Sequence, residues 1–181
     1  MAGSSAVIVV GLTTAALATV GVLTYQASAT APARLAGTQE AAAKAPKAPR
    51  DEQHPTALPH SSGRGERVVY SLDDDRVWLV ATGDRVKRTF QVTPSTVDPA
   101  PGTYTVTSRS NKATGADGTA IEHVVRFTSV DGTAIGFSAA VDGSTRPPKP
   151  GVRAGGIRET RQDGDAMWAF ATIGARIVVI R

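Results

Sequence analysis

The stretch VVYSLDDDRVWLVATGDRVKRTFQVT, residues 68–93, decides the fold class of this 181-residue chain. Residues 67–71 and 76–81 are rich in β-branched and aromatic side chains, and a Leu-Asp-Asp-Asp segment separates the two runs. Two such runs joined by a polar turn predict a β-hairpin. After Gly83-Asp84, residues 85–93 alternate between polar and apolar side chains, so we expect a third strand there.

Short β-rich runs continue to the C-terminus. Residues 109–119 are polar and rich in Gly and Asn, which predicts a loop, and residues 163–171 predict one short helix. Many short strands separated by turns are typical of a sandwich or barrel. The sequence therefore predicts one mostly all-β domain over residues 66–181, with further strands at residues 103–108, 121–130, 134–141 and 176–180.

Composition excludes several classes of function. The chain has no cysteine, so it holds no disulfide, no thiolate metal site and no thiol nucleophile. The net charge of +4 comes from scattered Lys and Arg, and no basic cluster indicates a nucleic-acid partner. His54 and His60 lie among prolines, and we predict neither a metal site nor a cofactor.

Residues 6–25, AVIVVGLTTAALATVGVLTY, form an uncharged apolar run. About 20 apolar residues cross the hydrocarbon core of a membrane as a helix. Two interpretations of residues 1–30 stay open: an uncleaved signal anchor, or a signal peptide cleaved after Ala29 in Ala-Ser-Ala. The length of the run favours the anchor. We expect a single-pass membrane protein with an extracytoplasmic C-terminal domain, or a secreted protein if cleavage occurs.

Residues 31–65 have a composition unlike either neighbouring region. They are rich in Ala, Pro, Thr and Lys and show no sustained apolar period. Segments of this kind are extended and partly polyproline-like. We therefore predict a disordered linker that tethers the domain to the membrane.

Four motifs in the domain occur in a familiar order. The hairpin of residues 68–93 precedes Pro-Ala-Pro-Gly-Thr-Tyr at 99–104, Ile-Gly-Phe-Ser-Ala at 135–139 and Arg-Ala-Gly-Gly-Ile-Arg at 153–158. In this order they resemble the catalytic domain of the L,D-transpeptidase family, over residues 67–181. The resemblance implies that family's β fold and a place in the bacterial cell envelope. Family members cross-link peptidoglycan stems through an acyl-enzyme on cysteine.

The chain departs from the family at its chemical positions. Where the family signature reads Ser-His-Gly-Cys-[Ile/Val]-Arg, the nucleophile position is Gly156 and the histidine position is Ala154. The family's upstream histidine position is Ser138. Because a glycine has no side chain to attack a carbonyl, we predict a non-catalytic module that binds peptidoglycan or an envelope protein. The oligomeric state is not predicted.

Arg158 matches the arginine that ends the family signature. The resemblance implies two roles for it: a ligand-binding residue that meets an anionic group of the substrate, or a structural ion pair that holds the loop. Arginine suits either role, because its guanidinium donates to both oxygens of a carboxylate.

An alternative function is acyl transfer with Ser138 as an altered nucleophile. Serine needs a base within hydrogen-bond reach, and His123 is the domain's only histidine. Strand alternation places His123 on or near the face of Val125 and Phe127, so we interpret it as structural or surface-exposed.

Overall fold

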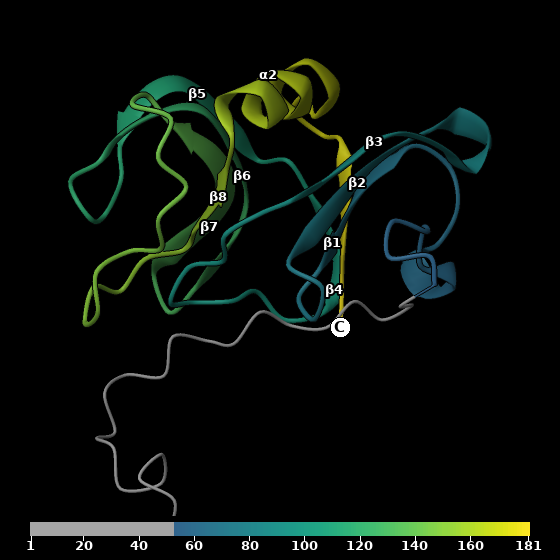
Figure 1. Ribbon diagram of the computed structural model, residues 1–181, viewed down its shortest axis with the longest axis horizontal. Coiled ribbons are helices and arrows are strands. Elements are labelled where there is room, and N and C mark those ends of the chain that lie inside the picture. Colours follow the sequence, from purple (N-terminus) through teal and green to yellow (C-terminus); the bar gives the residue numbers. More distant parts are fainter. Residues whose placement is uncertain (1–52) are drawn as a thin grey trace, which may run out of the picture. The chain divides into compact units, whose positions relative to one another are not determined.

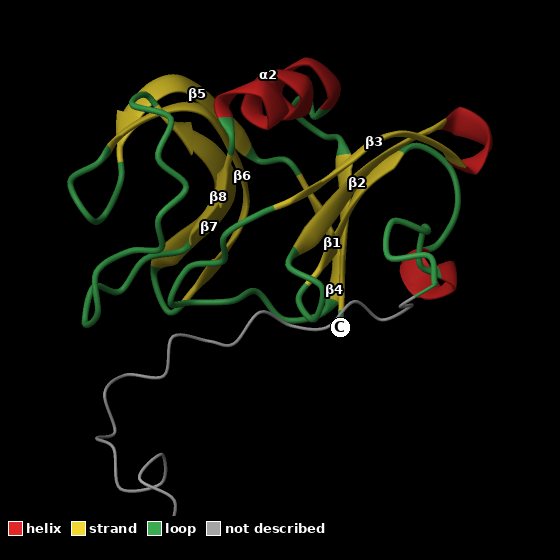
Figure 2. Ribbon diagram, viewed as in Figure 1, coloured by secondary structure: helices red, strands yellow, loops and turns green. Residues whose placement is uncertain are grey.

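A computed structural model describes residues 53–181. The predicted membrane segment, the predicted cleavage site and residues 31–52 of the predicted linker lie outside the described residues. Within residues 53–181, no helix has the length and apolarity needed to cross a membrane. These residues form two β-sheets and one α-helix (Figure 1, Figure 2).

The first sheet has five strands in the order β3-β2-β1-β9-β4. The hairpin predicted at its centre is confirmed, with Val69 opposite Trp78, and β9 then pairs with β1 in parallel. The short side chains at the turn suit its tight backbone, in which Asp75 has a φ of 46°. The strands are β1 (Arg67–Ser71), β2 (Arg76–Ala81), β3 (Arg85–Gln91), β4 (Gly102–Thr105) and β9 (Arg176–Ile180).

The second sheet has four strands in the order β5-β6-β7-β8. Antiparallel pairing joins β5, β6 and β7, whereas β8 runs parallel to β7 at the edge. These strands are β5 (Ser108–Thr114), β6 (Ala120–Val130), β7 (Thr133–Ala140) and β8 (Gly156–Glu159).

The polar loop predicted at residues 109–119 is wrong over most of its length. Ser108–Thr114 form β5, paired with β6. Because β5 lies at the edge of the sheet, its side chains are exposed or half-buried and show no apolar alternation. A true turn follows at residues 115–119, where Gly118 has a φ of 80°.

Helix α2 (Arg161–Phe170), the α-helix found within residues 53–181, lies above the two sheets (Figure 1). The sequence predicts it at residues 163–171. Its N-cap is Thr160, whose hydroxyl accepts a hydrogen bond from the backbone N–H of Asp163 at 3.2 Å. The helix packs on β6 and β7, and its Met167 is fully buried.

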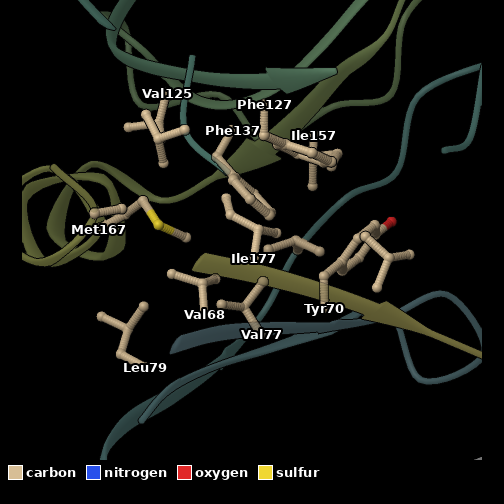
Figure 3. Close-up of a cluster of buried hydrophobic side chains, with 14 of the residues drawn as sticks. Val68, Tyr70, Val77, Leu79, Val125, Phe127, Phe137, Ile157, Met167 and Ile177 are labelled. Carbon is tan, nitrogen blue, oxygen red and sulfur yellow. The ribbon is translucent and has the colours of Figure 1, made fainter. Parts of the chain in front are cut away.

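The main hydrophobic core lies between the two sheets and under α2 (Figure 3). Tyr70 on β1 meets Phe137 on β7 edge to face, with ring centroids 5.8 Å apart. Such aromatic pairs add packing energy beyond the area that they bury. The core joins the sheets into one packed unit, and Val68, Val77, Leu79, Val125, Phe127, Ile157 and Ile177 contribute to it.

The outer face of the first sheet carries a second, smaller apolar cluster. Val69, Trp78, Val80 and Ile180 form it, and Leu58 packs on it from the preceding chain. The indole of Trp78 donates to the carbonyl of Thr56 at 2.9 Å. Residues 53–65 of the predicted linker, including η1 (His60–Ser62), therefore pack against the domain.

The chain after β3 crosses from the first sheet to the second. Thr93 exchanges two backbone hydrogen bonds with Arg158 on β8, each 2.8 Å long. The edge of the second sheet is covered in this way, which removes unpaired backbone groups from β8. Ser95, which follows shortly after, lines the site described next.

Candidate functional site

Pairing between β7 and β8 brings the predicted site positions together. In this parallel register Gly136 lies opposite Gly156, and Ser138 lies opposite Arg158. Residues that are about twenty positions apart in the sequence therefore become neighbours. Sequence spacing alone does not give this register.

These positions line one open pocket of about 360 Å³. Ser138, Ala154, Gly156 and Arg158 all contribute to its wall. Four arginines and a single carboxylate, Asp117, lie among the described residues that line it. The pocket is therefore strongly cationic, and its volume lies at the lower end of the range of small-ligand sites.

The loop that carries Ala154 is fixed by the segment after β3. The carbonyl of Ala154 accepts from the hydroxyl of Ser95 at 2.6 Å and from the backbone N–H of Val97 at 3.0 Å. Its N–H donates to the hydroxyl of Thr96 at 2.9 Å. Three short hydrogen bonds leave this stretch little freedom to move, so the pocket wall is preorganised.

Two glycines at the site are required by close packing. A Cβ on Gly155 would lie 2.4 Å from the carbonyl oxygen of Ala134. A Cβ on Gly136 would lie 2.6 Å from the carbonyl oxygen of Val125. Both distances are shorter than any real contact of this kind, so neither position admits a side chain without a backbone shift.

Gly156 has no such constraint. The nearest atom to a Cβ built there is the hydroxyl oxygen of Ser138, at 3.9 Å, which is an ordinary contact distance. Gly156 begins β8 in extended backbone that any residue can adopt. The position therefore has room for a side chain that would point toward the pocket, and the chain leaves that room empty.

Ser138 lies in the wall but lacks the partners of a nucleophile. It is 1% exposed, and its hydroxyl makes no hydrogen bond to any other residue within 53–181. An activated serine needs a base within about 3 Å. Nothing in the described site supplies one.

His123 is held elsewhere by helix α2. Its Nδ1 lies 3.0 Å from Oδ1 of Asp165, and its ring lies 5.3 Å from the ring of Trp168. A bulge in β6 gives His123 a φ of 52°. His123 is not among the described residues that line the pocket. The structure does not bring His123 and Ser138 together.

Arg158 and Asp117 carry opposite charges at the pocket. Burial lowers the pKa of Arg158, and the nearby carboxylates of Asp117 and Asp142 only partly oppose this effect. Burial by itself would raise the pKa of Asp117, but hydrogen bonds from Thr119 and the charge of Arg158 outweigh it and lower the pKa. Both groups are ionised at neutral pH.

Two groups near the site escape prediction from the sequence. Asp117 lies in a stretch expected to be a featureless loop, and only the Gly-Ala-Asp-Gly pattern of residues 115–118 indicates its turn. Glu159 follows Arg158 on β8 and is 1% exposed. No pattern in the sequence marks a buried glutamate at an edge strand.

A second pocket, of about 340 Å³, lies between residues 54–61 and Trp78. His54 and His60 line it with Asp74. Across residues 53–181, no three His, Asp or Glu side chains are grouped in a way that could hold a metal ion.

Comparison with known proteins identifies the fold. No family model and no curated protein matches the sequence. Solved structures of L,D-transpeptidases do match. The enzyme from Stackebrandtia nassauensis superposes with a TM-score of 0.57 at 12% identity, over 72% of this chain and 63% of that one.

Two further L,D-transpeptidase structures match at a TM-score of 0.51. The Mycobacterium smegmatis protein is 17% identical over 66% of this chain and 60% of that one. The Xylanimonas cellulosilytica protein is 14% identical over 70% of this chain and 66% of that one. The chain spans less than two thirds of each of the three structures. The predicted L,D-transpeptidase-like β fold is confirmed.

The contrast between Gly155 and Gly156 leads to a first prediction. Gly155→Ala should destabilise the domain by about 2–3 kcal/mol, because its Cβ would overlap the backbone of β7. The matched change Gly156→Ala should leave stability unchanged or raise it by up to about 1 kcal/mol. Urea unfolding of both variants measures the difference, and equal effects would contradict the packing argument.

Glu159 leads to a second prediction. Burial raises the pKa of this carboxyl well above its usual value, and the charge of Asp163 raises it further. Neither carboxyl oxygen bonds to another residue within 53–181. The folded domain therefore keeps the carboxyl proton of Glu159 at a pH where the unfolded chain has released it. The contribution of Glu159 to the free energy of unfolding is complete below about pH 4 and falls as the pH rises.

Glu159→Gln removes this titration. The variant should gain stability over the wild type between pH 4 and pH 7, by about 1.4 kcal/mol for each pH unit over which the two states differ by one proton. Urea unfolding at both pH values gives the gain. A difference that stays constant between pH 4 and pH 7 would show that Glu159 is ionised in the folded domain.

Proposed function

We propose that the chain is a non-catalytic, membrane-tethered module of the bacterial cell envelope whose pocket binds peptidoglycan. One observation carries the proposal. The open pocket in this L,D-transpeptidase-like fold is preorganised and cationic, yet Gly156 gives it no nucleophile and the described residues give Ser138 no base.

The argument against chemistry starts from Gly156. The family's reaction, as the resemblance implies it, needs a thiolate that attacks a carbonyl and later leaves. The chain has no cysteine anywhere. Packing does not force the loss, since the position has room for a side chain. The reactive side chains that the family uses are missing here. The close contact of Gly155 and the hydrogen bonds around Ala154 still hold the backbone of the site in place.

The argument for binding rests on charge and burial. Peptidoglycan stems carry carboxylates, and the pocket wall has an excess of arginine over aspartate. Arg158 is 8% exposed, with its guanidinium held among β8, Asp117 and the pocket. A charged hydrogen bond inside a partly water-excluded pocket is worth about 1.5–3 kcal/mol. Such a bond would strengthen the binding of a stem peptide by about tenfold to a hundredfold.

Two features of the sequence support the proposed envelope location. The apolar run of residues 6–25 has the length of one membrane crossing, and residues 31–52 would separate the domain from the membrane. Export across the membrane would place the domain beside the cell wall. Cleavage after Ala29 would instead release it.

Binding is tested by sedimentation of the full chain, kept in mild detergent, with purified peptidoglycan sacculi. We expect the wild type to sediment with the sacculi and Arg158→Gln to bind about tenfold more weakly. Arg85→Gln removes the same charge from exposed β3, outside the pocket, and should bind like the wild type. No sedimentation of folded wild type would contradict peptidoglycan binding and favour a protein partner.

The absence of chemistry is tested by acylation. Incubation of the full chain with a carbapenem should leave its intact mass unchanged, because Ser138 is covered and has no base. Gly156→Cys serves as the accessibility control, since its thiol should react with iodoacetamide at the open position. A carbapenem adduct on Ser138 of the folded wild type would establish the alternative, an acyl-transfer enzyme with a serine nucleophile.

A further inference from the structure

Two opposite charges face each other where the β5–β6 turn meets β8. Oδ2 of Asp117 lies 3.8 Å from Nη2 of Arg158, and their side chains are 15% and 9% exposed. This distance exceeds that of a hydrogen bond, so the two groups attract each other without using up their donors and acceptors. Both residues line the main pocket and a neighbouring one of about 240 Å³.

Arg158 retains donors for a ligand. Its Nε and Nη1 bond to no other residue within 53–181, although both are buried. Buried donors without a partner are costly, and such groups in native structures call for an explanation. A small rotation of the guanidinium toward the pocket would bring two of its N–H groups to the two oxygens of a carboxylate.

Two of the other three arginines at the pocket already have side-chain partners. Arg126 donates to the hydroxyl of Ser110 at 3.0 Å. Arg153 bonds to Thr133 at 2.8 Å and to Asp131 at 3.1 Å. Arg158 is therefore better placed than these two to take a ligand carboxylate.

The turn is built to hold Asp117 in place. Gly115 donates to the carbonyl of Thr119 at 2.8 Å, and Oδ1 of Asp117 accepts from the N–H of Thr119 at 3.0 Å. A Cβ on Gly115 would lie 2.7 Å from that same Oδ1, so a glycine is needed for Asp117 to fold back over the turn. Oδ2 is left facing Arg158 and can accept a donor from a ligand.

We propose that Arg158 and Asp117 together recognise a zwitterionic group, with a carboxylate and an ammonium on neighbouring atoms, as at an amino acid centre. Arg158 takes the carboxylate, and Oδ2 of Asp117 takes the ammonium. This inference rests on the proposed function, because it names the part of the ligand that the pocket selects.

Selectivity follows from the same two charges. A ligand with only a carboxylate meets the repulsion of Asp117, whereas a ligand with only an ammonium meets the repulsion of Arg158. The lowered pKa of Asp117 keeps its carboxylate charged at neutral pH, as this role requires. A ligand that carries only a negative charge would bind more tightly if residue 117 were uncharged.

The test uses three small probes with the full chain in mild detergent. Alanine is a zwitterion, N-acetylalanine an anion and alaninamide a cation. Titration followed through the amide NMR signals of Gly155 and Gly156 should show that alanine binds about tenfold more tightly than either of the others. Asp117→Asn should remove the preference for alanine over N-acetylalanine, and Arg158→Lys should weaken the binding of both.

Asp131→Asn is the matched control. It removes the same charge from a carboxylate that is 84% exposed and pairs with Arg153. Its backbone has a φ of 47°, which asparagine tolerates, so the variant should fold and keep the wild-type preference. Equal binding of alanine and N-acetylalanine by the wild type would overturn the inference, as would an effect of Asp131→Asn equal to that of Asp117→Asn.

The two proposals fail in different ways. If the wild type sediments with sacculi but shows no preference among the probes, peptidoglycan binding stands and zwitterion selection is wrong. If it prefers alanine but does not sediment, the charge pair has its proposed chemistry and peptidoglycan is not the ligand.

Discussion

The contact of Gly155 with the backbone of β7 is the constraint on which the pocket depends. Only a residue without a side chain can lie this close to Ala134, and the approach lets β8 pair with β7 in parallel. That pairing sets Ser138 beside Arg158. On the other side, Thr93 binds Arg158 through the backbone, so the strand is fixed from both edges.

Backbone contacts of this kind do not depend on which side chains face the pocket. The hydrogen bonds around Ala154 come from main-chain atoms and from the hydroxyls of Ser95 and Thr96. A domain held in this way can exchange reactive residues for small ones at little cost in stability.

Much of the fold is predictable from local sequence, and the exceptions have physical causes. The bounds of β1, β2 and β9 follow from β-branched runs that are buried on both faces. β5 leaves no such signal, because an edge strand needs few apolar side chains. Burial of Glu159 and the position of Asp117 depend on neighbours distant in sequence, which a single sequence does not reveal.

The packing of residues 53–65 on Trp78 has a consequence for how the domain is presented. Residues 53–65 lie along the outer face of the first sheet, on the side away from the second sheet (Figure 1). Strands of the second sheet carry most of the residues that line the pocket. A pull on the incoming chain would load the indole bond to Thr56 and the apolar cluster around it before any residue of the pocket. The entry of the chain and the pocket are thus mechanically separate.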